Sequence, residues 1–255
     1  GGNTTAGTND GGDAGVITVR NDSGSILIDD VTATGGTTAG GTAGTDGTIQ
    51  LSATTTIAQQ ATTAITAADG NLKLVSTGGD VTLNNVTNNV AIVAADLTGA
   101  SSLSYTDADE LSIGMIAQAG TGNAQLAAET GIVATGADET VTVTSLTDQL
   151  TVDDVVTTAS GNVVLMATAG ALQIDAAVTT TDGTATLTAG TTITSTAAGT
   201  ITTTGVNSAT QGTAGGEVLL HSTGAGAITL SGNITASGGN TTAGTNDGGD
   251  AGVIT

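Results

Sequence analysis

The chain has 255 residues with no Trp, Phe, Pro or Cys and a single tyrosine, Tyr105. Two basic residues against 23 acidic ones give a formal net charge of −21, which excludes nucleic-acid binding and disfavours docking on anionic membranes, because both need Lys and Arg. The near absence of aromatic side chains excludes an ordinary globular core, and the apolar 38%, mostly Ala, Val, Ile and Leu, suits a narrow interior lined by strands.

The start of the chain recurs at its end. Residues 1–18, GGNTTAGTNDGGDAGVIT, are identical to residues 238–255. The offset of 237 indicates that 1–237 form one repeat unit and that 238–255 begin the next copy. We therefore expect further copies joined end to end, and such arrays usually build length rather than perform chemistry.

A five-residue pattern returns along the chain: a small or turn-forming residue, a variable residue, then apolar–variable–apolar. Alternation with a period of two predicts a strand with one buried face. The pattern predicts first strands at 15–19, 47–51, 70–74, 88–92, 122–126, 139–143, 161–165, 183–187 and 216–220. The interval 88–121 predicts an irregular coil or two short ones.

Two further short apolar strands follow the first strand of each coil. Three strands per turn of about 20–22 residues predict an all-β, three-sided parallel β-helix, right-handed as crossover connections are, with nine or ten coils per 237-residue unit. A disordered Gly/Thr linker is the alternative, but its composition would lack periodic Val, Ile and Leu. The inward core positions that we expect are Val163, Leu165, Leu172, Ile174, Val218 and Leu220.

Three Gly-rich inserts lengthen the coils at 35–46, 205–215 and 238–251. They fall on consecutive coils once the unit is joined to its copy, and each follows the third strand of its coil. This placement predicts a ledge of three adjacent loops on one side of the rod at each repeat boundary. The loops are either tolerated surface excursions or a surface for lateral contacts between fibres.

Little in the chain indicates catalysis. His221, the single histidine, follows Val218 and Leu220 in alternation and is expected to face solvent. Adjacent carboxylates at 29–30 and 153–154 would point to opposite faces of a strand, which argues against acid–base work. We expect no enzymatic activity.

Calcium is the one cofactor that the sequence brings into consideration. The first candidate group is Asn9, Asp10 and Asp13 in a Gly-rich loop, with its copy at Asn246, Asp247 and Asp250. The second group is Asp107, Asp109 and Glu110. Calcium takes six to eight oxygen ligands from flexible loops, but the spacing of calcium-binding β-roll repeats is not met. The alternative is that the acidic residues keep the rods dispersed.

Threonine rows raise a comparison with ice-binding β-helices, in which flat ranks of Thr order water. Such rows occur at 140/142/144, 184/186/188 and 192/194/196. The middle position of other coils holds Lys73, Ala91, Gln125 and Val164, so the rank is broken. Outward Thr is more simply a good strand former.

The coils at 161–165, 183–189 and 232–236, together with the restart GGDAGVIT, resemble those of filamentous-haemagglutinin-type exoproteins. The resemblance covers nearly the whole chain. It implies a right-handed parallel β-helix, a place in a long secreted bacterial adhesin or fibre, and an extracellular or cell-surface location. It implies no catalytic residues, and the N-terminal secretion region of that family is not in this sequence.

These observations lead to one expectation with two alternatives. The chain is expected to be the structural shaft of a secreted tandem-repeat fibre, with lateral contacts through its Gly-rich loops and no membrane insertion, since it has no run of about twenty apolar residues. The first alternative is an adhesin or glycan-binding module, for which only Tyr105 offers an aromatic surface. The second is an ice-binding β-helix.

Overall fold

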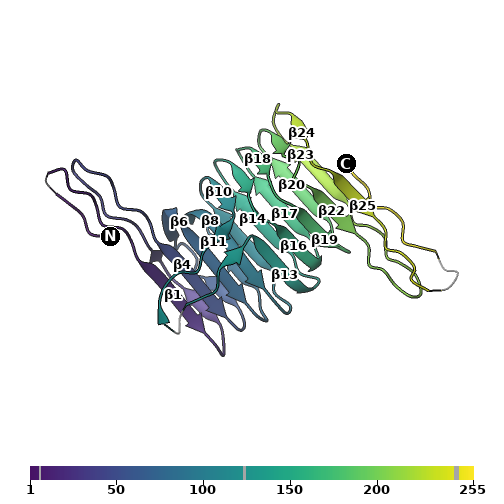
Figure 1. Ribbon diagram of the computed structural model, residues 1–255, viewed down its shortest axis with the longest axis horizontal. Coiled ribbons are helices and arrows are strands. Elements are labelled where there is room, and N and C mark those ends of the chain that lie inside the picture. Colours follow the sequence, from purple (N-terminus) through teal and green to yellow (C-terminus); the bar gives the residue numbers. More distant parts are fainter. Residues whose placement is uncertain (6, 123–124, 244–246) are drawn as a thin grey trace.

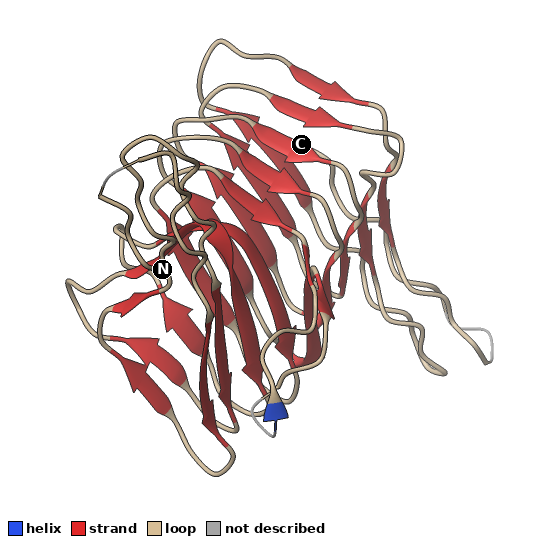
Figure 2. Ribbon diagram, turned by 60° about the vertical axis from the view of Figure 1, so that its left-hand side comes forward, coloured by secondary structure: helices blue, strands red, loops and turns tan. Residues whose placement is uncertain are grey.

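The computed structural model describes residues 1–5, 7–122, 125–243 and 247–255. Apart from one helical residue, Gly122, the elements of this part of the chain are strands (Figure 2), and all pairings between strands are parallel except one. The exception is the short antiparallel pair β11 (Met115–Ile116) and β12 (Glu129–Thr130). The all-β parallel architecture that the sequence predicts is confirmed, and it is consistent with a β-helix.

The parallel strands stack in three columns, defined by their pairing. Column I contains β1 (Val16–Asn21), β4 (Thr48–Ala53), the second parts of β6 (Ile65–Ser76) and β8 (Asn89–Leu97), then β13 (Ile132–Ala137), β16 (Val156–Ser160), β19 (Val178–Thr181), β22 (Ile201–Thr204) and β25 (Ile234–Ser237). Column II contains β2 (Ile26–Ile28), β5 (Ile57–Gln59), β7 (Val81–Leu83), β9 (Leu103–Asp107), β14 (Val141–Ser145), β17 (Val163–Ala167), β20 (Ala185–Ala189) and β23 (Val218–Ser222). Column III contains β3 (Val31–Thr32), the first parts of β6 and β8, then β10 (Leu111–Ile113), β15 (Leu150–Val152), β18 (Leu172–Ile174), β21 (Ile193–Ser195) and β24 (Ile228–Leu230). The strand β10 joins this column at the bend of β8, where it pairs with Ile92 and Val93.

Along the chain the columns are visited in the fixed order I, II, III. The long strands β6 and β8 run from column III into column I, so these two columns form one 15-stranded sheet while column II is a separate sheet of eight strands. Figure 1 shows the strands stacked side by side from the N-terminal to the C-terminal end. Each strand therefore pairs with the strand one turn earlier and one turn later.

The interior is filled by the inward members of each alternating strand. In column II, Leu165 stacks between Val143 and Leu187 in register, and β17 shows the pattern buried–intermediate–buried along its length. Five of the six expected core residues have no exposed surface: Val163, Leu165, Leu172, Ile174 and Val218. The sixth, Leu220, is half-buried and packs against the core. It lies on β23, next to the C-terminal end of the stack.

Side chains at the corners complete the backbone hydrogen bonds between turns. The Asn162 Oδ1 atom accepts a bond from the Thr184 N–H at 2.9 Å, and Asp80 Oδ1 does the same for Ser102 at 3.0 Å. Gly183 passes so close to the previous turn that a Cβ there would lie 1.8 Å from the Gly161 carbonyl oxygen. Short polar residues and Gly at these positions follow from the tight stacking of one turn on the next.

The expected strand at 122–126 is wrong. Residues 123–124 lie outside the described part of the chain, and Leu126 forms an antiparallel bridge with Ala119 instead of joining a column. Gly120 and Gly122 have positive φ values of 87° and 75°. Such values belong to a chain reversal rather than to a strand, so the segment between β10 and β13 is a hairpin built on β11 and β12.

Candidate functional site

The Gly-rich loops lie at the two ends of the stack. At the N-terminal end, the described parts of loop 1–14 run alongside insert 35–46, with the Gly36 N–H donating to the Gly12 carbonyl at 2.8 Å. The Asp10 and Asp13 carboxylates accept backbone bonds from Thr42 at 2.8 Å and Thr45 at 2.9 Å. The bond from Thr45 holds the pKa of Asp13 below its usual range.

The C-terminal end carries the matching pair of loops. The described parts of loop 238–251 run alongside insert 205–215, with the Gly239 N–H donating to the Thr213 carbonyl at 2.9 Å. Within the loop the Gly249 N–H donates to Gly239 at 2.8 Å, and its equivalent Gly12 donates to Gly2 at 2.9 Å. Figure 1 shows the two pairs extending from opposite sides of the stack.

The first group of calcium candidates is hydrogen-bonded to its neighbouring loop segments. The Asp10 and Asp13 side chains are engaged by insert 35–46, and the Asn9 carbonyl accepts bonds from two Thr hydroxyls. In the C-terminal copy, Asp247 and Asp250 are described, whereas Asn246 lies outside the described residues. Within the described chain no group of three His, Cys, Asp or Glu residues is placed to hold a metal ion.

The second calcium group is divided between the interior and the surface of the stack. Asp107 has no exposed surface, whereas Asp109 and Glu110 are exposed. Inside the stack, Asp107 Oδ2 accepts the Tyr105 hydroxyl at 2.6 Å and the Val90 N–H at 3.0 Å. Burial raises the pKa of Asp107 to about 6, against the opposing effect of these bonds, and it also raises the pKa of Tyr105.

The burial of Tyr105 corrects one sequence-based expectation. Its side chain has no exposed surface and so offers no face on which a sugar ring could stack. The alternation of β9 places Tyr105 inward, at the position equivalent to Leu83 and Val143 in neighbouring strands. The aromatic surface on which the glycan-binding alternative depended is therefore part of the core.

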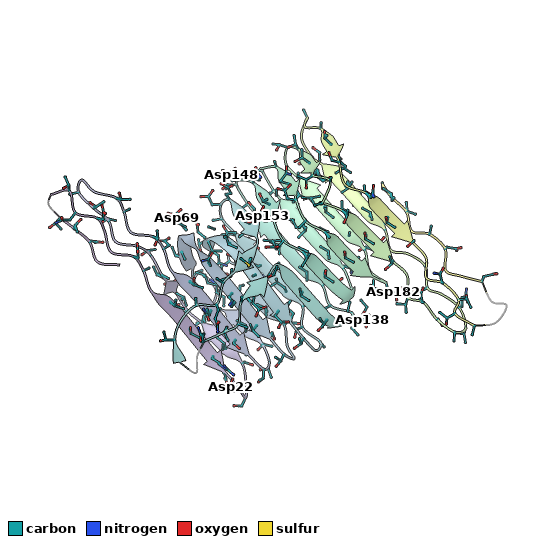
Figure 3. All side chains as sticks on the ribbon, viewed as in Figure 1. Asp22, Asp69, Asp138, Asp148, Asp153 and Asp182 are labelled. Atoms are coloured by element: carbon teal, nitrogen blue, oxygen red, sulfur yellow. The ribbon has the colours of Figure 1, made fainter. Side chains whose placement is uncertain are left out.

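An open acidic groove of about 630 Å³ lies on the outer surface of the stack, near β6, β8 and β10. Its carboxylates are Asp69, Asp109, Glu110 and Asp148. Figure 3 shows Asp69, Asp148 and Asp153 along one edge of the stack and Asp22, Asp138 and Asp182 along the opposite edge. The negative charge is thus distributed over both edges, which favours repulsion between neighbouring molecules.

The hairpin between β10 and β13 covers part of column I. Lys73 points outward from β6 but has no exposed surface, because its ammonium group donates to the carbonyl oxygens of Ala127 and Ala117 in the hairpin. Gln50, one turn earlier, donates to the Ala119 carbonyl at 3.1 Å. Burial lowers the pKa of Lys73, and the nearby charge of Glu129 opposes that shift. Sequence reasoning missed this role, since an outward Lys between two inward Leu residues is typical of any exposed strand.

The threonine rows expected from the sequence lie on different columns. Thr142 and Thr186 are outward on column II and are separated by Val164, whereas Thr194 lies on column III. Another rank, which sequence reasoning missed, runs along the outside of column I. It consists of Thr157, Thr179, Thr202 and Thr235 in register on four successive strands.

The remaining predictions concern catalysis and membranes. His221 is exposed on β23, as its alternation indicated. Among the described residues, no helix has the length and apolarity needed to cross a membrane. No family model, curated protein or solved structure matches the chain. The resemblance to filamentous-haemagglutinin-type exoproteins accordingly rests on the coil pattern of the sequence alone.

Proposed function

We propose that the chain is a segment of the shaft of a secreted, tandem-repeat fibre at a cell surface, formed by a right-handed three-sided β-helix. One observation carries this proposal: the second copy of the repeated segment continues the stack. Ile254, the copy of Ile17, bridges in parallel to Val218, and the Val218 N–H donates to the Val253 carbonyl at 2.8 Å. The start of a second copy thus adds the next strand to column II.

The strand order supports a count of turns per unit. The described strands fill nine positions in column I and eight in each of the other two columns before the second copy begins. These twenty-five positions correspond to eight and one third turns, fewer than the nine or ten expected, because Leu126 pairs with Ala119 next to the pair β11–β12 instead of joining a column. At about 4.8 Å per turn, one unit adds about 40 Å of length.

The shaft function is tested by making chains of one, two and four units and imaging them by electron microscopy. The proposal expects rods whose length grows by about 40 Å for each unit, because copies stack end on end. Compact particles whose units fold separately would contradict it. Surface labelling of the native cells with an antibody against the unit tests the extracellular location.

Binding of an ordered water layer such as ice is a second candidate function, favoured by the column I rank. Beside the four threonines of that rank lies a second row, Thr181, Thr204 and Ser237, two residues further along three of the same strands. Inhibition of ice recrystallisation is the measurement. The candidate expects activity that is lost in Thr179→Lys/Thr202→Lys and retained in the column II control Thr186→Lys; an inactive wild-type chain would eliminate it.

A further inference from the structure

The repeated segment occupies different columns at the two ends of the unit. At the N-terminal end, Ile17 pairs with Ile49 in column I. At the C-terminal end its copy, Ile254, bridges to Val218 in column II. The same sequence therefore starts one copy on one face of the stack and the next copy on the adjacent face.

The glycines at the corners show the same displacement. Gly15 lies beneath Gly47 at the corner before column I, where a Cβ on Gly47 would lie 1.9 Å from the Gly15 oxygen. Its copy Gly252 follows Gly216 at the corner before column II, where a Cβ on Gly252 would lie 2.1 Å from the Gly216 oxygen. Gly216 in turn stacks on Gly183, which lies one turn earlier at the same corner.

The cause is the number of strand positions in the unit. Twenty-five is one more than a multiple of three, so a stack that visits the columns in strict order cannot return to its starting column. The five-residue pattern begins on column I in β1 and β4 but on column II in β14, β17, β20 and β23. The change occurs across β6 to β13, where β6 and β8 each fill two columns.

We propose that each unit docks on the preceding one with a rotation of one third of a turn, so that successive loop ledges point in three directions around the fibre. This inference rests on the tandem array of the proposed function. A ledge would combine insert 205–215, loop 238–251 and the following copy's insert 35–46. Asp247 and Asp250 would receive the bonds that Asp10 and Asp13 receive from insert 35–46 at the N-terminal end.

The surfaces that meet in this arrangement are complementary. The rotation places β24 of one copy against β2 of the next, and β25 against β3. The inward residues are apolar on both sides of each contact: Ile228 and Leu230 meet Ile26 and Ile28, and Ile234 and Ala236 meet Val31 and Ala33. Ile228 is 42% exposed at the open end of this chain and would become part of the core. The partner that fits this end is therefore a second copy of the same chain.

The experiment uses a chain of four units that carries Ala39→Cys, an exposed position in insert 35–46 of a protein without native cysteine. Gold labels on these thiols are located by electron microscopy. We expect labels spaced by about 40 Å along the rod and rotated by about 120° from one unit to the next, in addition to any slow twist of the stack.

Deletion of 161–182 is the matched control, because it removes one whole turn, β17 to β19. It should shorten the spacing by about 5 Å and leave the rotation unchanged. Labels in a single row along one side would overturn the inference while leaving the rod intact. Particles that form no rod would instead overturn the proposed shaft function.

Discussion

The Asp107 carboxyl group lies inside the stack, where its folded-state pKa is about 6 because burial disfavours the charged form. Its ordinary pKa is 3.8. The group therefore stabilises the fold fully below pH 3.8, and this contribution is lost as the pH rises through about 6. A shift of this size corresponds to about 3 kcal/mol.

Asp107→Asn should remove this pH dependence, because the amide does not titrate. We expect the difference in unfolding free energy between the parent chain and the variant to change by about 2.5 kcal/mol between pH 4 and pH 7, with the parent relatively more stable at low pH. Urea unfolding at several pH values measures it. Asp109→Asn, at an exposed neighbour, is the control; an equal change in that variant would show that general charge repulsion is responsible.

Leu165 tests the core of the stack. Leu165→Asp would bury an unpaired carboxylate between Val143 and Leu187, and we expect a loss of about 4 kcal/mol or more. Met166→Asp, whose side chain points outward on the same strand, should cost less than about 1 kcal/mol. Thermal and urea unfolding of both variants make the comparison. Equal stability of the two would contradict the assignment of their faces.

Prediction from sequence succeeded at the residue scale where alternation alone decides the outcome. The inward face of β17 and β18 follows from the period of two, because successive side chains on a strand point to opposite faces. The interior place of Asp107 was not predicted, since a carboxylate in a polar segment resembles a surface residue. Only the alternation of β9, with Leu103, Tyr105 and Asp107 on one face, carried a signal.

At the scale of elements, the hairpin between β10 and β13 depends on Lys73. We expect Lys73→Met to loosen the hairpin, because it removes the donor to the Ala127 and Ala117 carbonyls, while the columns remain folded. Hydrogen–deuterium exchange should become faster by tenfold or more, the equivalent of about 1.4 kcal/mol, at the hairpin amides only.

Arg20→Met is the matched control, since Arg20 is the only other basic residue of the chain and its side chain is 40% exposed on β1. It should leave exchange in the hairpin unchanged. Faster exchange throughout column I after Lys73→Met would contradict a role limited to the hairpin.

The strand pattern of the sequence predicted that coils exist, but it did not predict which column each patterned strand joins. The five-residue pattern marks a strand in both halves of the unit, but it marks column I near the N-terminus and column II near the C-terminus. The pattern records which side chains face inward and carries no information on which face of the helix a strand joins. The pattern moves from column I to column II in the region of the long strands β6 and β8. In the sequence, each of these strands looks like two short strands separated by a turn.

At the scale of the whole molecule, both ends of the chain are open. The strands β24 and β25 expose apolar residues that a further copy would cover, including Ile228 at 42% exposure. Open strand edges of this kind promote association between molecules. The acidic residues along both edges of the stack oppose side-to-side contact, so association through the ends is favoured over lateral association (Figure 3).

Extending the chain by the next copy's residues 19–34 should stabilise it, because the added β2 and β3 would cover β24 and β25. Full burial of an aliphatic side chain contributes about 1.5–3 kcal/mol, and ordering the added residues offsets part of this gain. We expect a net increase on the order of 2 kcal/mol in the unfolding free energy, measured by urea unfolding. A control extension of the same length, with Asp at the positions equivalent to Ile26 and Ile28, should not stabilise the chain, because its inward face cannot join the core. Equal stabilisation by both extensions would mean that the second copy does not continue the columns.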